Sequence, residues 1–247
     1  MLKNHKLIIE YDGSAYHGWQ RQKEDITIQA EIEKALSIMT RQKVTLHSSG
    51  RTDAGVHAYG QAAHFLCDTN LNSEIFQKGL NSLLPDDIII RECTEVDENF
   101  HARYNARSKT YGYRILNREL PAAIYRNYAW YIRKELDVKK MQSAANHIIG
   151  EHDFKAFEGT GSPRVHTIRN VTAACFSKKE DSYIVFEIEA NGFLRYMVRN
   201  IVGSLVDVGL YKTTPDDFKR ILLSKNRNQA GLTAPPQGLF LIKVDYI

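Results

Sequence analysis

The sequence Gly50-Arg51-Thr52-Asp53-Ala54-Gly55-Val56-His57 joins two segments predicted to be strands, and it shows neither helical periodicity nor strand alternation. It holds a base, an acid and an imidazole between two glycines, which permit positive φ angles or close backbone approach. Asp-Ala-Gly is also a common turn, in which the aspartate side chain bonds to the backbone two residues on. The loop alone therefore fits either a structural turn or a catalytic carboxylate at Asp53.

The predicted elements on either side of this loop follow the order strand, helix, strand, strand, helix, strand. Strands are expected at residues 5–11, 44–47, 59–67 and from 88, and helices at 28–39 and 75–83. Thr27 is expected to cap the first helix. This order is that of the ferredoxin-like fold, with the Asp53 loop between the two middle strands.

The second half of the chain repeats this order loosely. Strands are expected at residues 110–116, 171–176, 183–190 and 239–246, and helices at 138–148, 193–208 and 215–222. The sequence thus predicts an α+β fold with two ferredoxin-like halves, residues 1–105 and 106–247. These halves are expected to form a largely antiparallel sheet with helices and a central active-site cleft.

The composition is that of an average soluble globular protein, since 43% of the 247 residues are hydrophobic and 25% are charged. No apolar run is long enough to span a bilayer. The N-terminal residues lead directly into a predicted strand without an apolar signal segment, which favours the cytoplasm. Cys67, Cys93 and Cys175 match no metal or redox spacing and are expected to be buried, reduced thiols.

Charge is distributed unevenly along the chain. Residues 67–100 contain eight acids and two bases, whereas residues 101–134 contain eight bases and one acid. The basic block is interleaved with aromatic residues: Tyr104, Tyr111, Tyr113, Tyr125, Tyr128, Trp130 and Tyr131. This mixture suits phosphate contact combined with base stacking, and it equally suits a solvated strand face with ordinary sheet aromatics.

Other residues could complete a site around Asp53. A guanidinium at Arg51 would favour the ionised carboxylate, which could act as a nucleophile or as a general base. Arg199 lies in an apolar helical segment and either extends to the surface or pairs with a buried carboxylate, for which Asp53 is the candidate. Strand alternation places Tyr111 and Tyr113 on one face, where a ring could stack on a base or belong to the core.

The histidines offer a weaker alternative. His57 and His64, or His147 and His152, could suggest a metal site, and Asp53 with His57 a metal-dependent hydrolase. None has a supporting cluster at ligand spacing, so structural histidines are expected and no metal is predicted.

Several segments together resemble the tRNA pseudouridine synthase A family. They are the 50–58 loop, Tyr11-Asp12-Gly13, Gly18-Trp19-Gln20-Arg21-Gln22, Asn81-Ser82-Leu83-Leu84-Pro85, Phe100-His101-Ala102-Arg103, Lys109-Thr110-Tyr111, residues 197–203 and residues 234–239. They occur in family order over nearly the whole chain. The resemblance implies the pseudouridine synthase fold, isomerisation of uridine to pseudouridine at tRNA positions 38–40 without a cofactor, and a homodimer.

The same resemblance implies roles for individual residues. Asp53 is the catalytic aspartate, Tyr111 the active-site tyrosine and Arg199 its paired arginine. Arg51 assists entry of the flipped nucleotide, and Leu239 backs the uracil. The remaining RNA-binding residues are expected to be Arg21, Arg103, Arg107 and Lys109. A non-catalytic RNA-binding protein built on ferredoxin-like modules is the alternative, although no clear RNP-type strand motif is present.

Overall fold

The fold was analysed in a computed structural model that describes residues 2–159, 161 and 166–246. The chain forms two compact units, one of Met1–Arg107 with Phe240–Ile247 and the other of Ser108–Leu239. The sequence placed all residues after 105 in one half, whereas the observed units return the last residues of the chain to the first unit. Among the described residues, no helix is long and apolar enough to cross a membrane.

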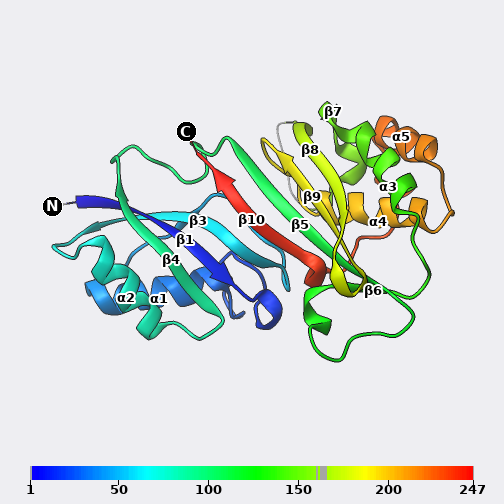
Figure 1. The fold of residues 1–247 in the computed structure, drawn as a ribbon. Helices are drawn as coiled ribbons and strands as arrows, with labels where there is room; N and C mark the ends of the chain where they lie inside the picture. The colour runs from blue at the N-terminus through cyan, green and yellow to red at the C-terminus, as the bar shows by residue number, and fades with distance from the viewer. Residues whose placement is uncertain (1, 160, 162–165, 247) are drawn as a thin grey trace. The chain divides into compact units, whose positions relative to one another are not determined.

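The elements of the first unit are β1 (Leu2–Tyr11), α1 (Ile28–Thr40), β2 (His47–Ser48), β3 (His57–Asp68), α2 (Ser73–Leu83), β4 (Ile88–Val96) and β10 (Leu239–Asp245). Its strands lie in the spatial order β4-β1-β3-β10 (Figure 1), and β2 also pairs with β3. β1 is antiparallel to both β3 and β4, and β10 is parallel to β3. The predicted order β-α-β-β-α-β is therefore present in this unit.

The strand expected at residues 44–47 is reduced to the two residues of β2. β2 is short because it shares β3 as a pairing partner with β10. β10 pairs with His57 and Ala58 at the start of β3, and β2 pairs with Ala63 and His64 further along. A strand that pairs over so short a length is not visible in the local sequence.

The second unit has an antiparallel sheet with the order β5-β9-β8-β7, and β6 runs parallel beside β5. Its elements are β5 (Ser108–Asn117), β6 (Trp130–Ile132), α3 (Val138–Ala145), β7 (Gly150–Asp153), β8 (Ile168–Lys178), β9 (Tyr183–Ala190), α4 (Met197–Gly209) and α5 (Pro215–Ser224). The predicted α+β class and largely antiparallel pairing are confirmed. The short strands β6 and β7 were not predicted.

Helix starts illustrate where local sequence rules hold. Thr214 forms the expected capping box with Asp217, and Pro215 is the first residue of α5. Thr27 occupies the N-cap of α1, but its side chain makes no capping hydrogen bond and its buried hydroxyl has no described partner. α4 begins at Met197 rather than at 193, because Tyr196 has a φ of 61° in the left-handed region.

Of the three cysteines, Cys67 is buried, Cys93 is partly buried and Cys175 is exposed, and all three are free thiols. The expectation of three buried thiols is therefore wrong for Cys175, which occupies an exposed position of β8. Burial raises the pKa of the Cys93 thiol to about 11.

Candidate active site

The Asp53 loop links β2 to β3 and is fixed by hydrogen bonds at both ends. The Val56 amide donates to the Asp53 carbonyl at 3.2 Å, which closes a tight turn, and Gly55 has a φ of 74°. Tyr11 and Thr52 share a buried hydroxyl–hydroxyl hydrogen bond of 2.7 Å directly beside Asp53. The positive φ expected for the two bracketing glycines is found at Gly55; Gly50 is not among the described positive-φ glycines.

The segment after β1 braces the loop from the other side. The Trp19 amide donates to the Thr52 carbonyl at 3.1 Å, and the Gly55 amide donates to the Tyr16 carbonyl at 3.3 Å. Gly18 has a φ of 90°, and a Cβ on it would lie 2.7 Å from the Thr52 carbonyl oxygen. The close backbone approach that the sequence assigned to Gly50 and Gly55 thus involves Gly18, and the backbone around Asp53 lies against the segment 16–19.

Side chains in this region form a buried polar network. The amide of Gln61 donates to the Gly50 carbonyl at 2.9 Å, and the Ser49 hydroxyl donates to Gln61 Oε1 at 2.8 Å. Burial raises the pKa of Tyr11, so its phenol stays protonated and can donate within the network. A satisfied buried network of this kind fixes one backbone conformation, as a positioned carboxylate requires.

His57 follows the loop and is 2% exposed. Its Nδ1 lies 3.1 Å from the Gly13 amide and 3.0 Å from Asp12 Oδ1, so it accepts from the former or donates to the latter according to its tautomer. Its ring stacks on Phe240 at 4.7 Å. His57 thus packs as a structural histidine, and the described residues contain no group of three or more His, Cys, Asp or Glu suited to a metal.

Asp53 is half-buried, whereas Arg51 is exposed. An exposed guanidinium two residues away is available to meet a nucleotide. The expected influence of Arg51 on the Asp53 carboxylate stays a prediction.

In the second unit, Tyr111 lies on β5 opposite Ile188 of β9 and is 8% exposed. Its ring meets Phe193 edge to face, with centroids 5.0 Å apart. Tyr113, expected on the same face, is completely buried and donates its hydroxyl to the Pro235 carbonyl at 2.7 Å. Tyr113 is therefore a core residue, and its burial raises its pKa.

Arg199 lies on the first turn of α4 and is half-buried. Its Nε donates to the Ala234 carbonyl at 2.7 Å, and its guanidinium carbon lies 5.0 Å from the centre of the Tyr196 ring. These contacts fix the side chain near the base of α4, so the reading in which Arg199 merely extends along the surface does not describe it.

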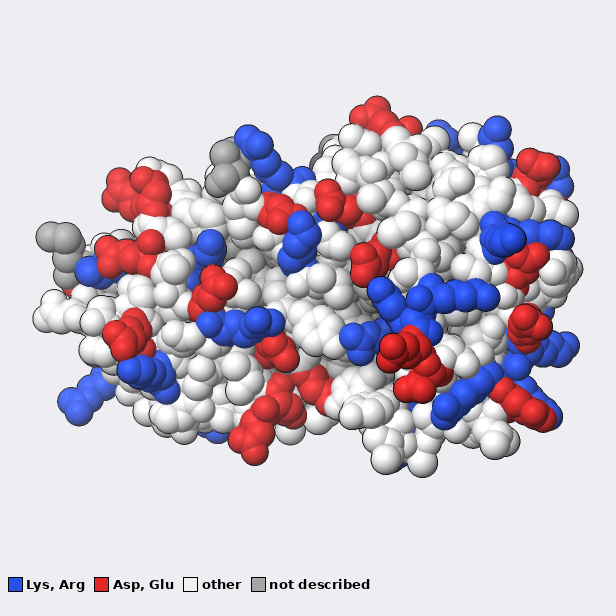
Figure 2. All heavy atoms as spheres, viewed as in Figure 1, with Lys and Arg blue, Asp and Glu red and all other residues white. Residues whose placement is uncertain are grey.

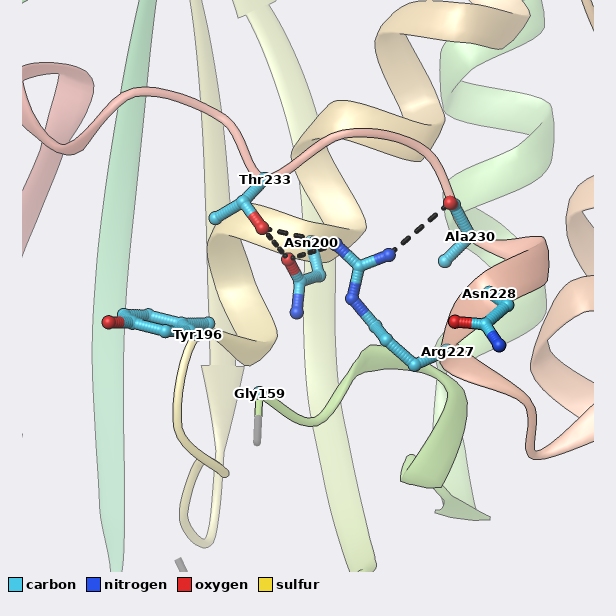
Figure 3. A pocket seen from close by; sticks show the side chains of 7 residues that line it. All are labelled: Gly159, Tyr196, Asn200, Arg227, Asn228, Ala230 and Thr233. Carbon is cyan, nitrogen blue, oxygen red and sulfur yellow. Dashed lines mark hydrogen bonds between the residues drawn. The ribbon is translucent and has the colours of Figure 1, made fainter. Parts of the chain in front are cut away.

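A cavity of about 360 Å³ is lined by Gly159, Tyr196, Asn200, Arg227, Asn228, Ala230 and Thr233 (Figure 3). One of these residues, Asn200, directly follows Arg199 in the chain. Arg227 donates to the side-chain oxygens of Asn200 and Thr233, each at 3.0 Å. It also donates to the carbonyls of Ala230 and Gly231. Burial lowers the pKa of Arg227. The network ties the segment that carries Ala234, and therefore the Arg199 acceptor, to α4.

The other predicted RNA-binding residues differ in their surroundings. Arg21 pairs with the buried carboxylate of Glu33 at 2.8 Å, a structural contact the sequence did not suggest. Arg103 and Arg107 are exposed, Lys109 is half-buried, and Leu239 is 5% exposed at the start of β10. On the face shown in Figure 2, basic side chains gather over the sheet of the second unit with acidic side chains beside them.

The predicted site residues are divided between the two units. The first unit contains Arg21, Arg51, Asp53, Arg103 and Arg107, and the second contains Lys109, Tyr111, Arg199 and Leu239. The predicted pairing of Arg199 with Asp53 therefore stays a prediction.

No functional role was predicted for Tyr196 or for Arg227. The local signal near Tyr196 is the apolar periodicity of α4. The segment between β1 and α1 contains glycines and aromatic residues together, a mixture that is unusual for a connector. That mixture is explained by its contacts with the Asp53 loop.

The family to which the chain belongs follows from comparison with known proteins. The profile of the family described as tRNA pseudouridine synthase matches residues 7–105 and 144–247. Proteins named tRNA pseudouridine synthase A from Thermoanaerobacter sp. (strain X514) and Acetivibrio thermocellus are 48% and 45% identical to the chain, and each alignment covers 99% of this chain and 100% of the relative. A protein of the same name from Pseudothermotoga lettingae is 41% identical over the same coverage. The chain therefore belongs to the tRNA pseudouridine synthase family.

Proposed function

We propose that the protein isomerises uridine to pseudouridine in tRNA, on the 3′ side of the anticodon stem-loop at positions 38–40, and that Asp53 is the nucleophile. The family assignment supports the reaction class. The observation that carries the assignment of Asp53 is the loop itself, in which the segment 16–19 and a buried polar network fix the backbone on both sides of half-buried Asp53.

The reaction exchanges one bond of the nucleotide for another. The bond between ribose C1′ and uracil N1 breaks, and a bond between C1′ and C5 forms. C5 loses its proton to solvent and N1 gains one, so the product is an isomer of the substrate. In this proposal the Asp53 carboxylate bonds transiently to the nucleotide while the uracil is reoriented, and it leaves when the C5 bond has formed.

The remaining residues receive roles that the residue types suit. Arg199 pairs with the Asp53 carboxylate and favours its ionised form. Tyr111 stacks on the flipped uracil and Leu239 backs it. Flipping costs roughly a few kcal/mol, of which one stacking contact can return about 1–3 kcal/mol. Arg51 occupies the space that the flipped nucleotide leaves in the RNA.

Substrate recognition is expected to depend on phosphates and shape, because side chains cannot read the deep groove of A-form RNA. The basic residues between Arg103 and Lys134 suit phosphate contact, and Arg103, Arg107, Arg118, Arg126, Arg133 and Lys134 are exposed. We further propose a homodimer located in the cytoplasm, with neither metal nor organic cofactor required.

The proposal is tested by release of tritium from C5-labelled uridine in tRNA. Asp53→Asn should fold and bind tRNA but release no tritium, and the exposed Asp86→Asn serves as the matched control with unchanged release. Turnover by Asp53→Asn at the wild-type rate would remove Asp53 from the mechanism. A wild-type protein that binds tRNA tightly but releases no tritium would instead favour the non-catalytic RNA-binding alternative.

A further inference from the structure

Tyr104 lies in the segment between β4 and β5, which Figure 1 shows as a loop leaving the first unit's sheet. Its side chain is 76% exposed, although a tyrosine ring is large and mostly apolar. Of the seven aromatic residues in the basic block, Tyr113 is core and Tyr111 is nearly buried, whereas Tyr104 and Tyr125, at 76% and 68% exposed, present open rings. Of these two, Tyr104 is the one whose ring packs against His101.

The Tyr104 ring packs against a cluster of three histidine rings. The His101 ring lies 4.2 Å from the Tyr104 ring between centroids. His64 meets His101 edge to face at 4.6 Å, and His47 lies 5.2 Å from His64 and 5.7 Å from His101. His64 is 2% exposed on β3, and its Nδ1 accepts the Ala102 amide at 3.1 Å. The cluster therefore connects the exposed ring to the sheet.

The backbone under Tyr104 is fixed by a closed turn. The Asn105 amide donates to the His101 carbonyl at 3.0 Å, and the His101 amide donates back to Asn105 Oδ1 at 2.6 Å. The Arg103 amide donates to His101 Nδ1 at 3.1 Å. Because the turn is already ordered, a ligand that stacks on Tyr104 would pay little conformational entropy to hold it.

The charge beside this ring favours RNA over an apolar protein partner. The Arg103 guanidinium carbon lies 5.8 Å from the Tyr104 ring centre, and residues 101–107 contain two arginines and no acid. An aromatic face next to a cation is the arrangement that holds a nucleobase and its phosphate together.

We propose that Tyr104 is a stacking site for an unpaired nucleobase of the bound RNA, with Arg103 on the adjoining phosphate. The inference rests on the proposed function, because it takes tRNA as the ligand. The stacked base is a second one, separate from the uridine that reacts. It lets the enzyme hold the loop of the RNA while another nucleotide is flipped.

Binding of a tRNA anticodon stem-loop is measured in the Asp53→Asn background, so that no turnover contributes. Tyr104→Ala should weaken binding about 5- to 100-fold, the range expected for one lost stacking contact. Tyr104→Phe and Tyr104→Trp should bind as tightly as the parent. The control is Tyr211→Ala, which removes a tyrosine that is 65% exposed but donates its hydroxyl to the Asp137 carboxylate at 2.9 Å, so that an acid lies beside it. This control should leave binding unchanged.

Two further measurements separate stacking from charge. Arg103→Ala should reduce the slope of log affinity against log salt by about one, whereas Tyr104→Ala should leave the slope unchanged. A series of stem-loops, each with one abasic nucleotide, should contain a position that weakens the parent as much as Tyr104→Ala does. At that position, Tyr104→Ala combined with the abasic nucleotide should weaken binding no more than either change does alone.

The inference is overturned if Tyr104→Ala binds normally, or if no abasic position couples to it. It is also overturned if the substitution acts by changing the oligomeric state, because Tyr104 would then belong to a protein interface. Failure of the proposed function gives a different pattern, in which the wild-type protein forms no pseudouridine whatever Tyr104 contributes to binding.

Discussion

The close contact between Gly18 and the Asp53 loop makes Gly18→Ala the most informative test of the site's construction. Gly18 has a φ of 90°, and its added Cβ would lie 2.7 Å from the Thr52 carbonyl oxygen and 3.1 Å from the Ala54 amide nitrogen. Ordinary contact begins at 3.4 Å, so one backbone segment must move by about 0.7 Å. The atoms concerned belong to the main chain, and no flexible side chain can yield instead.

Two costs follow from this geometry. The left-handed conformation costs an alanine about 1–2 kcal/mol, and with the displaced contact we expect a total loss of about 2–4 kcal/mol in the free energy of unfolding. Since a misplacement near 1 Å can cost about 10²-fold in rate, kcat should fall about 10- to 100-fold. KM should change less, because the basic residues proposed to contact RNA phosphates, between Arg103 and Lys134, lie elsewhere in the chain.

Urea unfolding measures the first effect, and tritium release under saturating tRNA measures the second. The matched control is Gly79→Ala in α2, whose new Cβ would meet only the mobile end of Met39. We expect that control to stay within about 1 kcal/mol of the wild type, with unchanged kcat. If Gly18→Ala matches the control in both stability and kcat, the loop is not positioned as described.

Three other perturbations test separate parts of the account. Tyr11→Phe removes the buried hydrogen-bond partner of the Thr52 hydroxyl. We expect the free energy of unfolding to fall by about 1–3 kcal/mol and kcat to fall as well. If neither quantity changes, the buried polar network does not position the Asp53 loop. Arg199→Met should abolish most tritium release, whereas its affinity for tRNA should fall far less; an unaffected rate would exclude Arg199 from catalysis. Tyr196→Leu should lower kcat and Tyr196→Phe should not, because it is the Tyr196 ring that contacts Arg199. Burial, with smaller contributions from His101 and His47, lowers the pKa of His64 from 6.5 to about 4, so the folded state disfavours its protonation. The contribution of neutral His64 to the free energy of unfolding should be fully present above pH 6.5 and should decline by up to about 3 kcal/mol as the pH falls toward 4. His64→Gln should flatten this decline. An identical pH dependence of unfolding in both proteins would contradict the lowered pKa of His64.

Much of the fold could be predicted from sequence because its longer elements have clear periodicity. The apolar faces of α1, α2 and α4 and the strand alternation of β5 and β9 are local patterns, and so is the capping box at Thr214. β6 and β7 are too short to show a pattern, and β2 overlaps the strand expected at residues 44–47 only at His47. The assignment of β10 to the first unit depends on its pairing with β3, a contact between residues distant in sequence.

The candidate site divides in the same way. Asp53 could be selected from its loop, and resemblance supplied Tyr111 and Arg199. The supporting contacts could not be read from sequence, because they depend on which backbones approach one another. Gly18 against Thr52, Tyr196 under Arg199 and the bonds of Arg227 are examples. Arg21 illustrates the reverse, since its ion pair with buried Glu33 is structural whatever further role it has.

Formation of pseudouridine in tRNA by the Asp53 carboxylate is measured most directly by mass-spectrometric mapping of pseudouridine in unmodified tRNA incubated with the pure protein or with Asp53→Asn. We expect pseudouridine on the 3′ side of the anticodon stem-loop, at positions 38–40, with the wild type and none with the variant. Unmodified tRNA after incubation with the wild type, or equal modification by both proteins, would contradict this expectation.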